Sequence, residues 1–163
     1  MTAAATVPAD LEIGTISGDS FPLREWVTTF HLVVVVIDPY TDESSWLLDT
    51  ASRVLSVFRG ADCRVAWLVT AGADDAKTFL GPYAKDLLTL LDPDKALVKA
   101  LGLERLPALV HIRQDCSVAG AAEGWKPSEW QTVTDQLGDV MSWSKPRLPA
   151  VGDPSPFVGS PAT

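Results

Sequence analysis

Cysteine is the residue type in this chain with the most clearly defined chemistry, and the chain has two of them, Cys63 and Cys116. The thiolate form of cysteine attacks disulfides and binds metal ions. The two cysteines lie far apart in the sequence and form neither a Cys-x-x-Cys pair nor a metal-ligand cluster. Cys116 falls in a predicted turn, where we expect exposure, so it is the first candidate for a reactive thiol. Cys63, at the start of a predicted strand, is the second.

Two adjacent serines, Ser44 and Ser45, offer hydroxyl groups, but a serine nucleophile needs a general base within hydrogen-bond reach. The chain has two histidines. We place His31 before the first central strand and His111 inside a later one, so neither is expected beside the serines. Serine is a preferred residue at helix N-caps. We therefore interpret Ser44 or Ser45 as the N-cap of the helix that follows.

The acidic residues around the serines also have structural interpretations. Asp38 ends a strand in an Asp–Pro turn. Asp42 and Glu43 precede the expected helix, where negative charge complements the helix dipole. No cluster of His, Cys and carboxylate residues has metal-ligand spacing. We expect neither a metal ion nor a cofactor.

Hydrophobic patterning predicts an α/β domain that would position these residues. The continuous apolar run 32–37 is typical of a parallel strand covered on both faces, and RVAWLVT (64–70) is expected to be a second buried strand. The segment 45–58 between them has the apolar spacing of an amphipathic helix, so the unit predicts a right-handed crossover. Further strands are expected at 11–16, 87–91, 108–112 and 118–122, and further helices at 74–80, 92–101 and from 127 onward.

The segment GLERLPALVHI (102–112) resembles the thioredoxin superfamily, in which a helix end and a short loop lead to a proline and an antiparallel strand. LLDPDKALVKALGL (90–103) and SGDSFPLREW (17–26) are similar to one branch, the peroxiredoxins of the alkyl hydroperoxide reductase/thiol-specific antioxidant type and the related disulfide reductases. The resemblance covers about residues 11–142. It implies a thioredoxin-like fold: a central mixed sheet with helices on both faces and one helix–strand insertion. It also implies a cis peptide bond before Pro107, facing the active site.

The positions at which this family carries its redox cysteines hold other residues here. In the thioredoxin register, Ser44 and Leu47 take the places of the two cysteines. In the peroxiredoxin register, Trp46 takes the place of the catalytic cysteine. The degenerate redox motif is therefore Ser44, Ser45, Trp46 and Leu47. Because a hydroxyl does not replace a thiolate in thiol–disulfide exchange, we expect no catalytic residue at this site.

The resemblance implies a groove in which active relatives hold a substrate polypeptide. Its expected lining here is Tyr40, Thr41, Trp46, Leu106 and Pro107. Trp46 is the first candidate for a binding contact because exposed tryptophan is enriched at binding hot spots. We interpret the chain as a redox-inactive protein-binding or adaptor module that uses this groove.

Two alternatives stay open. One is an enzyme, a thiol peroxidase or disulfide reductase that uses a relocated cysteine, Cys116 or Cys63. The other is a structural subunit that dimerises through a sheet edge or a helix face.

Charge and composition restrict the partners and the compartment. The net charge of −8 disfavours nucleic acid and anionic membranes, because both require clustered Lys and Arg. No apolar run approaches the ~20 residues of a membrane span, and the N-terminus lacks the pattern of a secretory signal. We expect a cytoplasmic protein whose partner is another protein, with a homodimer as an open alternative.

The predicted domain is 11–143. The preceding residues, 1–10, are expected to be flexible. The last segment, 144–163, holds five of the twelve prolines and shows neither a helical nor a strand period. This composition predicts a disordered tail.

Overall fold

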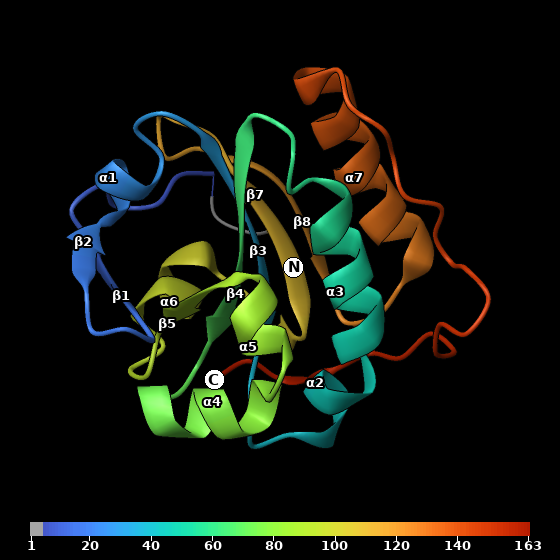
Figure 1. Cartoon of the computed structure of the whole chain (residues 1–163), viewed down its shortest axis with the longest axis horizontal. Helices are drawn as coiled ribbons and strands as arrows, with labels where there is room; N and C mark the ends of the chain where they lie inside the picture. The colour runs from blue at the N-terminus through green and yellow to red at the C-terminus, as the bar shows by residue number, and fades with distance from the viewer. Residues whose placement is uncertain (1–4) are drawn as a thin grey trace.

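The computed structural model describes residues 5–163 and contains a seven-stranded mixed sheet in the order β2-β1-β5-β4-β3-β7-β8 (Figure 1). Its strands are β1 (Glu12–Thr15), β2 (Ser20–Pro22), β3 (His31–Ile37), β4 (Cys63–Val69), β5 (Leu88–Leu91), β7 (Ala108–Ile112) and β8 (Val118–Glu123). The helices are α1 (Leu23–Trp26), α2 (Asp42–Trp46), α3 (Leu48–Val57), α4 (Ala73–Leu80), α5 (Tyr83–Asp86), α6 (Ala96–Leu101) and α7 (Pro127–Met141). A separate two-stranded sheet pairs β6 (Arg105–Leu106) with β9 (Ser160–Pro161).

Strand β3 lies at the centre of the main sheet, parallel to β4 on one side and antiparallel to β7 on the other. Strand β5 continues the parallel part beside β4, whereas β1 and β8 are antiparallel to their neighbours. Because β3 is paired on both edges and covered on both faces, 32–37 is buried throughout. This architecture confirms the predicted α/β class. The helix–strand insertion that the resemblance implied lies at 71–91, where α4 and α5 are followed by β5.

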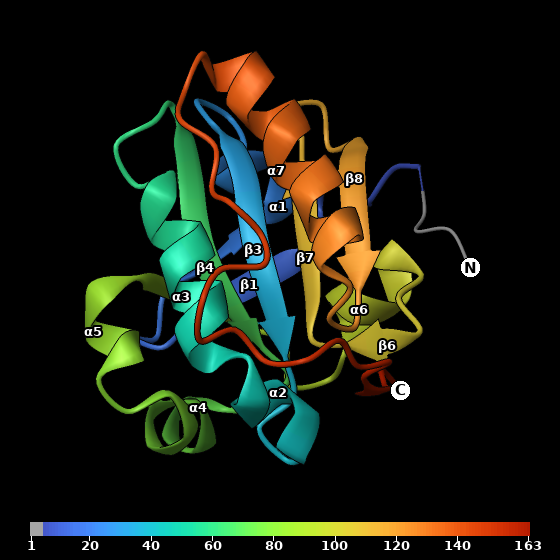
Figure 2. The same cartoon turned by 90° about the vertical axis from the view of Figure 1, so that its right-hand side faces the viewer.

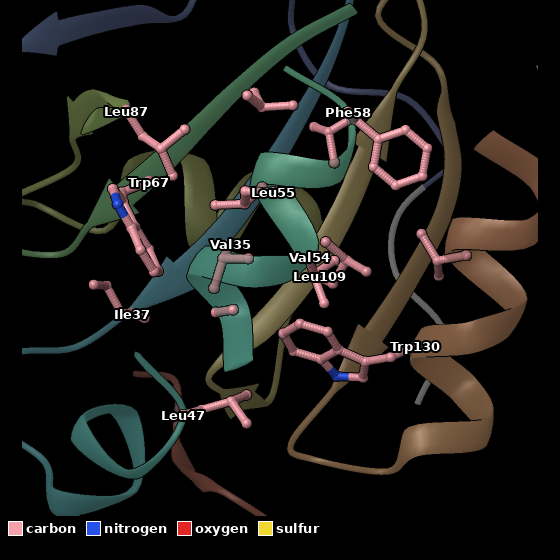
Figure 3. Close-up of a cluster of buried hydrophobic side chains, with 14 of the residues drawn as sticks. Val35, Ile37, Leu47, Val54, Leu55, Phe58, Trp67, Leu87, Leu109 and Trp130 are labelled. Atoms are coloured by element: carbon pink, nitrogen blue, oxygen red, sulfur yellow. The ribbon is translucent and has the colours of Figure 1, made fainter. Parts of the chain in front are cut away.

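Alternate residues of β3 face two separate hydrophobic cores, as the strand period requires. Val35 and Ile37 pack with α3 and α7 on one face of the sheet, and Figure 3 shows part of this core with Trp130 in it. Val34 and Val36 pack with α1 and α6 on the other face. Helices therefore cover both faces, which fixes the ends of β3 and β7 relative to the helices that follow them.

Two helices differ from their predicted boundaries. The expected helix 45–58 is divided into α2 and α3 at Leu47, whose φ of −106° and ψ of 2° are not helical. Helix α6 begins at Ala96 rather than at Asp92, because the Asp92 carboxylate accepts hydrogen bonds from the backbone N–H groups of Leu97 (3.2 Å) and Val98 (3.0 Å). Asp92 thus satisfies the free N–H groups of the first turn from outside the helix.

The N-terminal segment differs from the expectation of flexibility over 1–10. Residues 1–4 lie outside the described part of the chain. From residue 5 onward the backbone lies along the β7–β8 turn, where the N–H of Val7 donates to the Cys116 carbonyl at 3.0 Å and that of Val118 donates to the Ala5 carbonyl at 2.8 Å. Val7 is buried. These contacts with a distant turn are not visible in the local composition.

The C-terminal segment 144–163 also differs from its prediction as a disordered tail. It runs back beside α7, reaches α3 and then crosses the carboxyl end of β3 towards β6 (Figure 2). Leu148 and Ala162 are buried, and the indole N–H of Trp143 donates to the Val57 carbonyl at 2.6 Å. The prolines keep this segment from forming a helix or a long strand. Its backbone and side chains nevertheless find partners on other elements.

None of the helices in the described part of the chain is both long enough and apolar enough to span a membrane.

Candidate functional site

The candidate site lies at the carboxyl end of β3, where Asp38 and Pro39 lead into α2. Strand β7 begins beside it, because Val36 of β3 is paired with Ala108 of β7. The peptide bond between Leu106 and Pro107 is cis, which confirms the conformation that the resemblance implied. The α2 loop and the Pro107 loop therefore flank the same end of the sheet.

Ser44 is fully buried inside α2, and its hydroxyl is occupied by hydrogen bonds to the loop. Its Oγ accepts the backbone N–H of Asp38 at 3.0 Å, and the Thr41 hydroxyl donates to it at 3.3 Å. The N-cap of α2 is Thr41, so the interpretation of Ser44 or Ser45 as the N-cap is wrong. The helix starts earlier than predicted, and Ser45 instead donates to the Asp42 carbonyl at 2.6 Å. Ser44 is thus a buried structural hydroxyl.

Leu47, at the second position of the degenerate motif, is part of the hydrophobic core. It is buried with the α3 residues Ala51 and Val54, and Figure 3 shows it at the edge of that cluster. Both positions at which we expected vacant redox-cysteine sites, Ser44 and Leu47, are therefore filled by buried side chains with defined structural contacts.

Asp38 is buried in the turn that leads into α2. Its carboxylate accepts the backbone N–H of Tyr40 at 3.0 Å, and the Lys95 ammonium lies 3.8 Å away. These contacts confirm the interpretation of Asp38 as a turn residue. Lys95, which has a positive φ of 60°, lies immediately before α6. The ion pair therefore joins the loop after β3 to the loop before α6.

Two aromatic side chains beside the buried motif are exposed. Tyr40 is 68% exposed and Trp46 is 56% exposed. The Tyr40 hydroxyl donates to the Asp75 carboxylate, an interaction that raises the pKa of Tyr40. The Trp46 ring meets the Phe157 ring edge to face, with 5.4 Å between ring centroids. The site therefore exposes two aromatic side chains, Tyr40 and Trp46, and the C-terminal segment contributes the ring that contacts Trp46.

The same C-terminal segment occupies the Leu106 side of the expected groove. Leu106 and Pro107 are both buried, and Leu106 is paired with Ser160 of β9. The Ser160 hydroxyl donates to the Leu106 carbonyl at 3.3 Å, and the N–H of Ala162 donates to the Glu104 carbonyl at 2.8 Å. Of the expected groove residues, Tyr40 and Trp46 are exposed and Thr41 is half-buried, while Leu106 and Pro107 are inaccessible. No local pattern in the proline-rich sequence 144–163 indicated this arrangement.

Comparison with known proteins gives matches to solved structures only: no family model matches the chain, and neither does any curated protein. Peroxiredoxin Q of Xanthomonas campestris aligns with a TM-score of 0.65 and 15% identity over 86% of this chain and 96% of its own. The exposed lipoprotein thioredoxin Etrx1 of Streptococcus pneumoniae aligns with a TM-score of 0.63 and 18% identity over 80% and 99%. A secreted disulfide oxidoreductase of Mycobacterium tuberculosis, homologous to DsbE of E. coli, aligns with a TM-score of 0.58 and 17% identity over 72% and 86%.

The fold is thioredoxin-like. At these identities the likeness concerns the fold, and the chemistry has to be judged from the residues of this chain.

Both cysteines of this thioredoxin-like domain lie at the opposite end of the sheet from α2. Cys63 begins β4 opposite His31, and Cys116 lies in the β7–β8 turn; both are free thiols. Burial and the nearby Asp62 raise the pKa of Cys63 to about 11. Cys116 is only 5% exposed, so the expectation of an exposed thiol is wrong. The Cys116 side chain faces inward from the turn. Burial together with Asp115 raises the pKa of Cys116. Neither thiol has the lowered pKa of a reactive cysteine.

The two histidines form a pair that we did not predict from the sequence. His31 Nδ1 and His111 Nε2 are 2.8 Å apart, at the same far end of the sheet as the cysteines. Burial, the adjacent His31 ring and Arg113 lower the pKa of His111 to about 4. The pKa of His31 is also lowered, by burial and by Arg113, against an opposing effect of Asp115. The pairing depends on the β3–β7 register, which sequence patterns do not define.

Within residues 5–163, no three side chains of His, Cys, Asp or Glu gather as they would around a metal ion. The expectation of a protein without metal or cofactor stays a prediction.

Proposed function

We propose that this chain is a redox-inactive thioredoxin-fold protein that binds another polypeptide at the α2 end of its sheet. One observation carries the proposal: Ser44 and Leu47 are buried and committed to packing, whereas Tyr40 and Trp46 next to them are exposed. On this proposal the chain retains the thioredoxin-like fold around α2, while Ser44 and Leu47 supply no nucleophile there.

The positions of the two cysteines support the redox-inactive part of the proposal. Cys63 and Cys116 are buried at the far end of the sheet, and their raised pKa values keep both thiols protonated near neutral pH. A protonated thiol is a poor nucleophile. The relocated-cysteine enzyme is therefore not the function we favour.

The exposed aromatic surface supports the binding part of the proposal. Tyr40 and Trp46 combine a large apolar face with a polar group, the combination enriched at protein interfaces. The C-terminal segment adds Phe157, whose ring meets that of Trp46 edge to face. The net charge of −8 favours a protein over a nucleic acid as the partner.

The test is to select short random peptides on the intact chain and to measure their affinity for two variants. Trp46→Ala removes the central exposed ring, and we expect affinity to fall by about tenfold or more, as for a binding hot spot. Phe30→Ala is the matched control, because Phe30 is an exposed aromatic residue just before β3, at the opposite end of the sheet. Peptides that bind Trp46→Ala as tightly as the unmodified chain would contradict the proposal.

A further inference from the structure

We infer that residues 154–163, the terminal segment, act as an internal ligand. They fill the groove between β6 and Trp125, and a partner polypeptide must displace them from it. The sequence of this segment indicates the kind of partner that would replace it. That partner is an extended peptide with an aromatic residue two positions before a glycine and small side chains after the glycine. The inference rests on the proposed function and names the class of its partner.

The terminal segment is held as an added strand, by backbone hydrogen bonds on two sides. The N–H of Trp125 donates to the Phe157 carbonyl at 2.8 Å, and the N–H of Phe157 donates back to Trp125 at 3.0 Å. Further along, Ser160 is paired with Leu106, and the N–H of Ala162 donates to the Glu104 carbonyl. Strand addition of this kind is a general mode of peptide recognition.

The close approach of two backbones selects glycine at one position. Gly159 has a φ of +92°, and a Cβ added there would lie 2.6 Å from the Leu106 carbonyl oxygen. Gly124 faces the segment from the other side, where an added Cβ would lie 2.3 Å from the Val158 carbonyl oxygen. A side chain at position 159 therefore has no space, and the groove requires a residue without one.

Three side chains of the segment are in contact with the groove. Phe157 meets the edge of Trp46, and Ser160 and Ala162 are buried. The intervening residues, Val158 and Pro161, point to solvent and are exposed. The recognised pattern is therefore Phe-x-Gly-Ser-x-Ala, with small side chains after the glycine.

The segment is anchored by an ion pair upstream, and downstream it is held by short stretches of backbone pairing. Asp153 is fixed to α3 by Arg53 at 2.7 and 3.0 Å and by the Thr50 hydroxyl at 2.8 Å. Beyond this anchor, Ser155 and Pro156 are exposed, and β9 is only two residues long. A short tether gives the segment an effective concentration on the order of millimolar at its own groove. A free peptide therefore competes poorly until the segment is released.

The test uses two glycine variants of the intact chain. Gly159→Ala places a methyl group against Leu106, whereas Gly152→Ala is the matched control, since Gly152 has a similar φ of +93° but nothing within 4 Å of an added Cβ. A labelled peptide of sequence PSPFVGSPAT, residues 154–163, is titrated against each variant. We expect Gly159→Ala to expose residues 157–162 to amide exchange and to bind the peptide at least about tenfold more tightly than the Gly152→Ala variant. The same peptide with alanine in place of its glycine should bind to neither.

A second pair of variants keeps the test decisive if Gly159→Ala disturbs the fold. Ala162→Asp places a charge at a buried position of the terminal segment, and Thr163→Asp places the same charge at an exposed one. Only Ala162→Asp should release the segment and increase peptide binding. Release of the segment without peptide binding, or equal peptide binding by all variants, would overturn the inference. If library peptides still bind through Trp46 but bind no better after release, the proposed function stands and this inference fails.

Discussion

Leu106 and Ser160 face each other in an antiparallel backbone pair although 54 positions separate them in the sequence. Leu106 immediately precedes the cis bond to Pro107, so the segment around Ser160 returns to the loop beside α2. This pairing closes one half of the expected groove and leaves the aromatic half, Tyr40 and Trp46, at the surface.

The Asp153 anchor is expected to stabilise the packed C-terminal segment. Its carboxylate pairs with Arg53 and Thr50, and these contacts lower its pKa to about 2 against the opposing effect of burial. Asp153→Ala should reduce the free energy of unfolding by about 1–3 kcal/mol at pH 7, because Thr50 loses its partner in a buried position. Urea unfolding measures this loss. Asp49→Ala, at an exposed position of α3, is the control and should have little effect.

The pH dependence of this anchor has a defined sign. Because the pKa of Asp153 is lower in the folded chain than its ordinary 3.8, the stabilisation is complete above about pH 4 and is lost as the pH falls towards 2. The difference between the unmodified chain and Asp153→Ala should shrink over that interval. A difference that stays constant from pH 5 to pH 2 would show that the ion pair is not its source.

The histidine pair predicts a separate loss of stability at mildly acidic pH. Both rings have lowered pKa values, that of His111 about 4, so below pH 6.5 the unfolded chain binds more protons than the folded one. Stability should therefore fall between pH 6.5 and pH 4, with a slope of up to about 1.4 kcal/mol per pH unit for each proton. Arg113 reinforces the effect and Asp115 opposes it at His31. In His111→Gln the slope should become shallower, as followed by urea unfolding at several pH values, and an unchanged slope would contradict the account.

Trp46 and Leu47 are neighbours in the sequence with opposite expected roles. Leu47→Ala should cost about 2–5 kcal/mol of unfolding free energy, because Leu47 is buried in the α3 core. Trp46→Ala should cost about 1 kcal/mol or less, because more than half of that side chain is already exposed. Thermal or urea unfolding distinguishes the two. Equal costs would mean that Trp46 is a packing residue rather than a binding surface.

The thiols are expected to react slowly with alkylating agents in the folded chain. The pKa of Cys63 is about 11 and that of Cys116 is raised above its ordinary value, so both thiolate fractions are small at pH 7. Single-cysteine variants, alkylated over a range of pH, report each thiol separately. In urea, both rates should rise to those of an unperturbed cysteine. A native thiol that titrates well below pH 8.5 would revive the enzyme interpretation.

The sheet and helices were predictable from the sequence because their signals are local. The run at 32–37 is apolar on both faces, and the helices that cover it carry apolar residues at helical spacing. The motif around Pro107 predicted a cis bond that the structure contains. The residue types at Ser44 and Leu47 likewise led to the prediction that this end of the sheet carries no redox cysteine.

The remaining features depend on contacts between distant segments. The composition of 144–163 predicts disorder, yet Asp153 meets Arg53 and Ser160 meets Leu106 across more than fifty positions. The burial of Cys116 depends on the direction in which the β7–β8 turn points its side chain, at a φ of 67°. These are properties of the assembled domain, which local patterns do not encode.

The most direct test of the account is a turnover measurement on the intact chain. Reduction of insulin disulfides by dithiothreitol and consumption of hydrogen peroxide are followed with the unmodified protein, Cys63→Ser and Cys116→Ser. We predict that all three give the rates measured without protein, because Ser44 and Leu47 supply no thiolate and both thiols are buried. A rate above that background that disappears in Cys116→Ser or Cys63→Ser would contradict the redox-inactive function.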